Sequence, residues 1–279
     1  MSRLPCRNLC SSILLMLCVF APGTYSEQQS ESLYFGSVAM DIPAVMQQRL
    51  QPLTEYLTEQ LDRSVRLYLS ADMPAAIDAA ASGKVDLAYL TPVAYLHAHE
   101  QGQVQLIAKT VTDGKGAFRL MIVVRDDSPI QKVEDLAGKR FAFGDKAALL
   151  QRAVVVGAGI PLESLGEYHF IGHYDNIVRG VLNGDFDSGI LKDTMAYKWK
   201  DKGIRVVYES AELPPYNIVA RAGLDPKLLV RLRQAFLKLN PENLEHRDII
   251  KSLDQKYDGF VTATDAEYDV VRSLVRPFQ

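Results

Sequence analysis

The residues that could do chemistry in this chain form no recognisable catalytic set. No serine lies in the Gly-x-Ser-x-Gly context of a hydrolase nucleophile, and no Ser/His/Asp set is suggested. His97 and His99 are two positions apart, so a helix would point them to different faces, which argues against a metal site. Gly157-Ala158-Gly159 ends a predicted helix instead of following a strand, the wrong context for a nucleotide loop. We therefore expect no enzyme activity, no metal and no cofactor.

The N-terminal segment has the layout of a secretory signal peptide. Two arginines precede an apolar run from Ile13 to Ala21, and Thr24-Tyr25-Ser26 supplies a small-x-small pattern before the first acidic residue, Glu27. The apolar core is about half of the ~20 residues that a membrane span needs. We predict a signal peptide over residues 1–26, cleaved near Ser26, and a periplasmic mature protein.

Two alternatives remain for this segment, a retained anchor helix and a lipoprotein modified at Cys18. Leu17 argues against the second, because it stands where the lipoprotein pattern has Gly, Ala or Ser. All three cysteines of the chain precede Ser26, so the mature chain would have no disulfide and no thiolate ligand. Cleavage also removes two arginines and no acid, which moves the formal charge from −3 to −5. A mildly acidic chain without a basic run does not suit nucleic acid.

The rest of the chain alternates strand patterns with helix patterns, from a strand at 32–38 to a helix at 264–275. This alternation indicates an α/β fold built on mostly parallel sheets flanked by helices. Polar or proline-rich breaks interrupt it near 111–117 and 210–216. We predict two lobes, one formed by residues 27–112 with 216–279 and the other by residues 113–215, joined by two hinge crossings.

Three blocks of sequence carry a family resemblance. They are GKVDLAYLTPVAYLHA at 83–98, RDDSPIQKVEDLAGKRFAFGD at 125–145 and IGHYDNIVRGVLNGDFDSGILKD at 171–193. In motif, order and spacing they resemble the periplasmic phosphate/phosphonate-type (PhnD-like) substrate-binding proteins of ABC transporters, over essentially the whole mature chain. The resemblance implies a two-lobed, type II periplasmic binding protein-like fold, with the ligand outside the carboxyl ends of the strands.

Several side chains of the first lobe should face that cleft. Tyr89, Thr91 and Tyr95 surround a strand end and the next helix start, and Met40 and Asp41 follow the first strand. We predict all five as ligand-binding residues. The alternatives are that Thr91 only caps its helix, that Tyr95 belongs to the core and that Tyr89 is simply buried.

On the other side of the cleft, the resemblance implies that His173 matches a histidine that points at the anion in the phosphonate binders. Lys192 and Asp193 end a strand where that family places an acid or a hydroxyl, although Asp193 is as well explained as a helix N-cap. Tyr216 follows the Pro-Pro break at the return crossing, where hinge packing is the alternative. We predict these four as ligand-binding residues.

One loop departs from the family. In the phosphonate binders, a Ser-Thr-Ser-Gly sequence follows the Phe-Gly-Asp that ends the second block. The hydroxyls of that sequence and the N-terminal amides of the next helix hold the anion. Here Gly144-Asp145 continues as Lys146-Ala147-Ala148, without hydroxyls, and Asp145 could itself occupy the free N–H groups. Lys146, and Arg119 near the first crossing, supply positive charge that could hold an anion in another way.

The function implied by the resemblance is that of a solute-binding protein, monomeric and without a nucleic-acid partner. It would close on a small ligand, with a phosphate/phosphonate-like or other oxyanion as the leading class, because only the closed form contacts the ligand from both lobes. It would then deliver the ligand to the permease of an ABC importer. The alternative is a ligand-sensing subunit that docks on a membrane sensor receptor, which the divergent loop keeps open.

Overall fold

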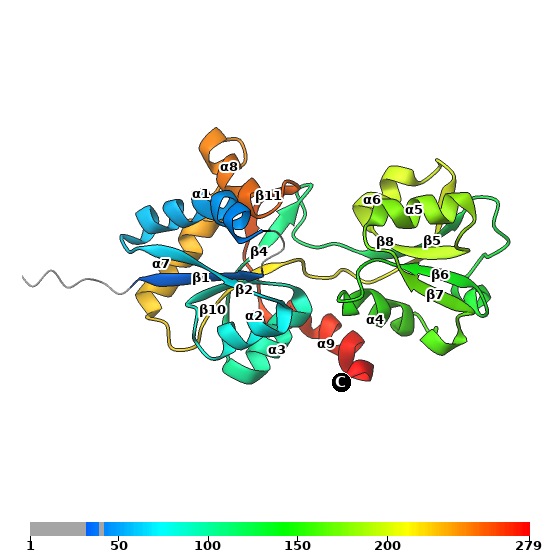
Figure 1. Ribbon diagram of the computed structural model, residues 1–279, viewed down its shortest axis with the longest axis horizontal. Helices are drawn as coiled ribbons and strands as arrows, with labels where there is room; N and C mark the ends of the chain where they lie inside the picture. Colours follow the sequence, from blue (N-terminus) through cyan, green and yellow to red (C-terminus); the bar gives the residue numbers. More distant parts are fainter. Residues whose placement is uncertain (1–31, 39–41) are drawn as a thin grey trace, which may run out of the picture. The chain divides into compact units, whose positions relative to one another are not determined.

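The computed structural model describes residues 32–38 and 42–279. The predicted signal peptide and the candidate residues Met40 and Asp41 lie outside these ranges. Within them, no helix combines the length and the apolar character that a membrane crossing requires. Two sheets organise the described part of the chain (Figure 1).

The first sheet takes strands from both ends of the chain. Its order is β11-β4-β10-β3-β1-β2. The strands are β1 (Leu33–Val38), β2 (Val65–Ser70), β3 (Leu87–Leu90), β4 (Gln105–Thr112), β10 (Asn217–Ala220) and β11 (Tyr257–Val261). β1 pairs in parallel with β2 and β3, whereas β10 is antiparallel to β3 and β4, and β11 is antiparallel to β4.

The second sheet is formed by the middle of the chain, in the order β7-β6-β8-β5-β9. Its strands are β5 (Leu120–Arg125), β6 (Arg140–Phe143), β7 (Glu167–Phe170), β8 (Ser188–Lys192) and β9 (Ile204–Glu209). β6 is parallel to β7 and β8, and β5 is antiparallel to β8 and β9.

Both sheets are therefore mixed, and the prediction of mostly parallel sheets needs this correction. The physical reason is the route of the chain between the sheets. Asn217, the first residue of β10, pairs with Leu90, the last residue of β3. The returning chain thus enters the first sheet at the carboxyl edge of its parallel strands and must run against them.

Helices cover both faces of the first sheet (Figure 1). α1 (Pro43–Leu61), α7 (Pro226–Lys238) and α8 (Leu244–Leu253) share one buried cluster with alternate strand residues such as Phe35, Leu87 and Ile218. α2 (Met73–Ala81), α3 (Pro92–Gly102) and the C-terminal α9 (Asp269–Val275) bury the other face with Ala88 and Val219. Successive residues of a strand face opposite sides of the sheet, which explains the two separate cores.

The second sheet is covered in the same manner. α5 (Tyr174–Asn183) and α6 (Asp193–Trp199) pack on Met121, Val123 and Ala142. α4 (Leu149–Gly157) packs on the other face, and its Val154 belongs to the same buried cluster as Val271 of α9. The short 3-10 helices are η1 (Val133–Leu136), η2 (Leu162–Ser164), η3 (Asp265–Tyr268) and η4 (Arg276–Phe278).

The chain passes from the first sheet to the second between β4 and β5 and returns between β9 and β10. The two crossing segments are tied to each other, because Phe118 and Leu213 exchange both backbone hydrogen bonds, at 3.0 and 2.8 Å. These segments coincide with the two breaks in the sequence pattern. The division into two lobes that move against each other remains a prediction.

Candidate functional site

The candidate residues lie where strands end at the sheet edges nearest the crossings. In the second sheet, the loops after β6, β7 and β8 lead directly into α4, α5 and α6. In the first sheet, β3 leads into α3, and the start of β10 lies beside the end of β3. Loops at carboxyl ends of strands are the usual position for a ligand site in α/β sheets.

A group of tyrosines supports this edge of the first sheet. Tyr89 is 5% exposed, and its hydroxyl lies 2.5 Å from that of Tyr257. Its ring stacks on Tyr216, with centroids 4.9 Å apart and planes inclined by 26°. Burial raises the pKa of Tyr89, and to a lesser degree that of Tyr216, so both stay neutral at ordinary pH. The buried ring of Tyr89 thus packs against the half-buried ring of Tyr216, whose contact with a ligand remains a prediction.

Thr91 caps its helix and Tyr95 lies in the core, which are the structural alternatives given above. The hydroxyl of Thr91 accepts a hydrogen bond from the Ala94 amide at 3.1 Å and so caps α3. Tyr95 is 1% exposed, and its hydroxyl donates to Asp265 at 2.5 Å, beneath the C-terminal segment. A ligand contact by Tyr95 does not fit this position, because its ring lies inside the core and its hydroxyl already has a partner.

Two predicted ligand residues, Asp193 and Arg119, form structural contacts at the crossing segments. Asp193 is 8% exposed, and its carboxylate accepts hydrogen bonds from the Arg119 amide at 3.0 Å and the Thr194 amide at 2.8 Å. The Arg119 guanidinium pairs with Glu209 at 2.9 Å and Glu212 at 3.4 Å. Asp193 is the first residue of α6, not its N-cap. Both side chains hold the start of β5 against its neighbours, which leaves them less available to a ligand.

Lys192 is a cation at this edge that forms no salt bridge with any of the described residues. It ends β8, and its Nζ lies 5.1 Å from the centroid of the Phe118 ring on the first crossing. Among the described residues, none accepts a hydrogen bond from this Nζ. Burial lowers the pKa of the Lys192 ammonium, partly offset by the nearby carboxylate of Asp193. A partly desolvated ammonium without an acceptor is stabilised when a bound oxyanion supplies one.

The loop after β6 differs from its predicted conformation. α4 begins at Leu149, with Ala148 at the N-cap position and no side-chain cap, so Asp145 does not cap this helix. Asp145 instead forms a local turn, its Oδ1 accepting from the Ala147 amide at 2.8 Å. Lys146 is exposed at the tip of this loop, and its carbonyl accepts from Arg152 at 3.2 Å.

His173 lies at the adjacent loop, after β7. It is exposed and occupies the N-cap position of α5 without a capping hydrogen bond from its side chain. The amide of the preceding residue, Gly172, donates to the Gly144 carbonyl at 3.1 Å, so the loops after β6 and β7 are in contact. The structure therefore brings His173 beside the loop that carries Asp145 and Lys146.

Two further residues of this region were missed by sequence reasoning. Gln151 is 6% exposed, its Oε1 accepts from the Gly144 amide at 2.8 Å, and its Nε2 donates to the Tyr174 hydroxyl at 3.4 Å. Burial raises the pKa of Tyr174 to about 12. The available signals were a lone amide side chain among apolar residues of α4 and a tyrosine next to His173.

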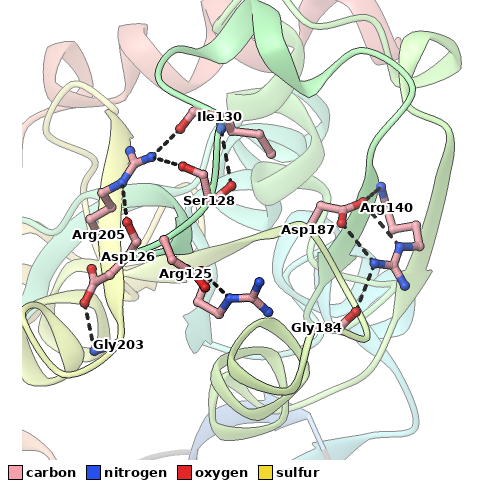
Figure 2. Close-up of polar contacts among 10 residues, drawn as sticks. Arg125, Asp126, Ser128, Ile130, Arg140, Gly184, Asp187, Gly203 and Arg205 are labelled. Carbon is pink, nitrogen blue, oxygen red and sulfur yellow. Dashed lines mark hydrogen bonds and ion pairs between the residues drawn. The ribbon is translucent and has the colours of Figure 1, made fainter.

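A pocket of about 160 Å³ lies at the opposite edge of the second sheet and contains two arginines, Arg125 and Arg140. Both arginines are already paired (Figure 2): Arg125 pairs with Asp127 at 2.5 Å, and Arg140 pairs with Asp187 at 2.9 Å and donates to the Gly184 carbonyl at 2.9 Å. Arg205 donates to the carbonyls of Ser128 and Ile130, at 2.9 and 2.6 Å. Because α5 ends at this pocket, its carbonyl end makes the place unfavourable for an anion.

The remaining titratable side chains give no metal centre in the part of the chain that is described. Residues 32–38 and 42–279 contain no group of three or more His, Cys, Asp or Glu side chains arranged to hold a metal ion.

Comparison with known proteins places this geometry in context. The profile of the family described as "ABC transporter, phosphonate, periplasmic substrate-binding protein" matches residues 35–268. The "Phosphate-import protein PhnD" of Mycolicibacterium smegmatis is 25% identical, over 90% of this chain and 87% of that protein.

Two solved structures show the same fold. XAC2383 from Xanthomonas citri, bound to ATP, has a TM-score of 0.71 and 20% identity, covering 88% of this chain and 96% of that one. PhnD1 from Prochlorococcus marinus, in complex with methylphosphonate, has a TM-score of 0.67 and 20% identity, covering 88% and 98%. Both likenesses extend over both sheets of the present chain.

Proposed function

The chain belongs to the phosphonate-type periplasmic substrate-binding proteins of ABC transporters, and on that premise we propose that it binds a small ligand bearing an oxyanion and delivers it to an ABC importer. The family is one of binding proteins and not of enzymes. The proposed ligand class is phosphate- or phosphonate-like, and it is supported by the names of the relatives.

The single observation that carries the proposal is the unsatisfied ammonium of Lys192. It ends a buried strand, lies against the Phe118 ring and lacks an acceptor among the described residues. A charge-assisted hydrogen bond from this group to an oxyanion contributes about 1.5–3 kcal/mol. Side chains from other loops at this edge would complete the site: His173 and Tyr174 at the start of α5 as donors, and the ring of Tyr216 as an apolar wall.

Binding would be coupled to movement of the two sheets. Lys192, His173 and Tyr174 belong to the second sheet and its helices, whereas Tyr216 rests on Tyr89 of the first sheet. A ligand that contacts both groups favours the conformation in which they converge, by no more than its difference in affinity for the two conformations. The permease of the importer would recognise that conformation.

The experiment compares the wild type with Lys192→Gln in calorimetric titrations with methylphosphonate and inorganic phosphate. Lys198→Gln is the matched control, because Lys198 is exposed on α6. We expect the wild type to bind one of the two probes and Lys192→Gln to lose about tenfold or more in affinity, equivalent to about 1.4 kcal/mol. The control should keep the wild-type affinity. Failure of the wild type to bind either probe would contradict the proposed ligand class.

A sensing role is the second candidate, favoured by the loss of hydroxyls from the loop after β6. In that case the ligand-bound form would dock on a membrane receptor in place of a permease. Uptake of the bound ligand by cells that lack this gene separates the two roles. Import predicts that uptake is lost, and sensing predicts that uptake persists while a ligand-dependent response disappears.

The proposal includes the organisation expected from the sequence. Secretion would remove residues 1–26, and the mature monomer would consist of a lobe of residues 27–112 with 216–279 and a lobe of residues 113–215. The mass of the mature protein from a periplasmic extract tests the cleavage near Ser26, and sedimentation tests the monomer. Labels placed on the two lobes report whether their separation changes when ligand is added.

A further inference from the structure

Four backbone amides of the loop after β6 and the start of α4 are already hydrogen-bonded within this region. The Gly144 amide donates to Gln151 Oε1 at 2.8 Å, and the Ala147 amide donates to Asp145 Oδ1 at 2.8 Å. The next two amides, of Ala148 and Leu149, donate to carbonyls of the same loop, each at 2.9 Å. These four amides are therefore not free for a bound anion, in contrast to those of a helix N-terminus that is left open for one.

Gln151 keeps the loop closed. It is 6% exposed, and a Cβ built at Gly144 would lie 2.9 Å from its Nε2 and 3.0 Å from the Gly172 carbonyl oxygen. A side chain at position 144 would require Gln151 or the Gly172 carbonyl to shift. The carboxamide also reaches the Tyr174 hydroxyl, so it connects the loop after β6 to the start of α5. The conformation of the loop is therefore stabilised by a buried polar side chain, that of Gln151.

Asp145 is an exposed acidic residue of this loop. Its side chain is exposed, and one carboxylate oxygen is bonded to the Ala147 amide. The other oxygen has no hydrogen bond within residues 32–38 and 42–279. The neighbouring loop, joined to this one by the bond between Gly172 and Gly144, carries His173. Asp145 thus places an acceptor beside the groups assigned to the ligand.

We propose that Asp145 determines ligand specificity by accepting a hydrogen bond from the ligand, so that the site takes an oxyanion carrying an O–H or N–H donor and rejects a fully ionised one. The inference rests on the proposed function and names the ligand class more narrowly. An ionised carboxylate only accepts hydrogen bonds, and it repels an anion that brings no proton. Phosphate-type groups keep or lose their last proton near neutral pH, whereas sulfonates have none to offer.

The test measures binding of methylphosphonate and methanesulfonate, two probes of similar size that differ in the available proton. Wild type, Asp145→Asn and Asp185→Asn are titrated at about pH 6 and about pH 8.5, on either side of the proton loss of the phosphonate. Asp185 is the matched control, because it is exposed in the turn between α5 and β8, at the opposite edge of the same sheet.

We expect the wild type and Asp185→Asn to prefer methylphosphonate by about tenfold or more and to bind it more tightly at the lower pH. Asp145→Asn, whose amide also donates, should bind methanesulfonate better and lose most of the pH dependence. Equal selectivity and equal pH profiles in wild type and Asp145→Asn would overturn the role of Asp145 while leaving an oxyanion site in place. Absence of binding of both probes by the wild type would overturn the proposed ligand class together with this inference.

Discussion

The ring of Tyr216 stacks on the ring of Tyr89, at a centroid distance of 4.9 Å, and the Tyr89 hydroxyl is in turn bonded to Tyr257. The stack begins in the interior of the first sheet and ends at the return crossing. It gives the ring of Tyr216 one orientation beside the candidate site. A tyrosine fixed in this manner binds a ligand with little further loss of side-chain freedom.

The two tyrosines should respond differently to substitution. Tyr216→Ala removes the wall and should lower ligand affinity about tenfold, whereas Tyr89→Phe keeps the stack and should change affinity little. Tyr89→Phe removes one hydrogen bond from the buried Tyr257 hydroxyl and should cost about 0.5–1.5 kcal/mol of stability. Calorimetric titration and urea unfolding measure the two effects. The assignment fails if Tyr216→Ala binds as the wild type does.

Asp193 should prove structural. Its carboxylate holds the amides of Arg119 and Thr194 and is almost fully buried, so Asp193→Ala leaves both amides without an acceptor. We expect a loss of about 1–3 kcal/mol in the free energy of unfolding. Thr194→Ala, at an exposed neighbouring position, is the control and should stay within about 0.5 kcal/mol of the wild type. An Asp193→Ala protein as stable as the wild type would refute the role.

Alkaline pH should destabilise the protein in part through Tyr174. Burial raises its pKa to about 12, above the ordinary tyrosine value of 10.0. The unfolded chain therefore loses this proton first, so the stabilisation is complete below pH 10 and is lost as pH rises toward 12. Tyr174→Phe should show a shallower loss of stability over this interval, measured by urea unfolding at several pH values. Identical slopes in both proteins would contradict the assignment.

The arginine pocket of Figure 2 should matter for folding and not for binding. Arg140→Gln breaks the pair with Asp187, which lies near the surface, so only a small loss of stability is expected. Ligand affinity should be unchanged, because the pocket and Lys192 lie at opposite edges of the sheet. A fall in affinity that exceeds the change in stability would show that this pocket takes part in binding.

Much of the candidate site could be predicted from the order of strands and loops. The patterns before Thr91, Lys146, His173 and Lys192 end strands, and parallel strands bring their carboxyl ends to one edge. What could not be predicted was which of these side chains are already engaged. Asp193 and Arg119 lie 74 positions apart in the chain, and no local pattern reveals that one accepts a hydrogen bond from the other.

The sequence alone determined the alternation of strands and helices, the two breaks and the family, because these depend on local periodicity and on short motifs in order. It also determined that the loop after β6 lacks hydroxyls. Only the tertiary structure decided the direction of the strands, since the route between the sheets makes β10 run against β3. It alone decided that Gln151 closes the loop at Gly144 and that Lys192 is left without an acceptor. Hydrogen-bond partners are chosen by proximity in space, and the chain brings these groups together only when both cores are packed.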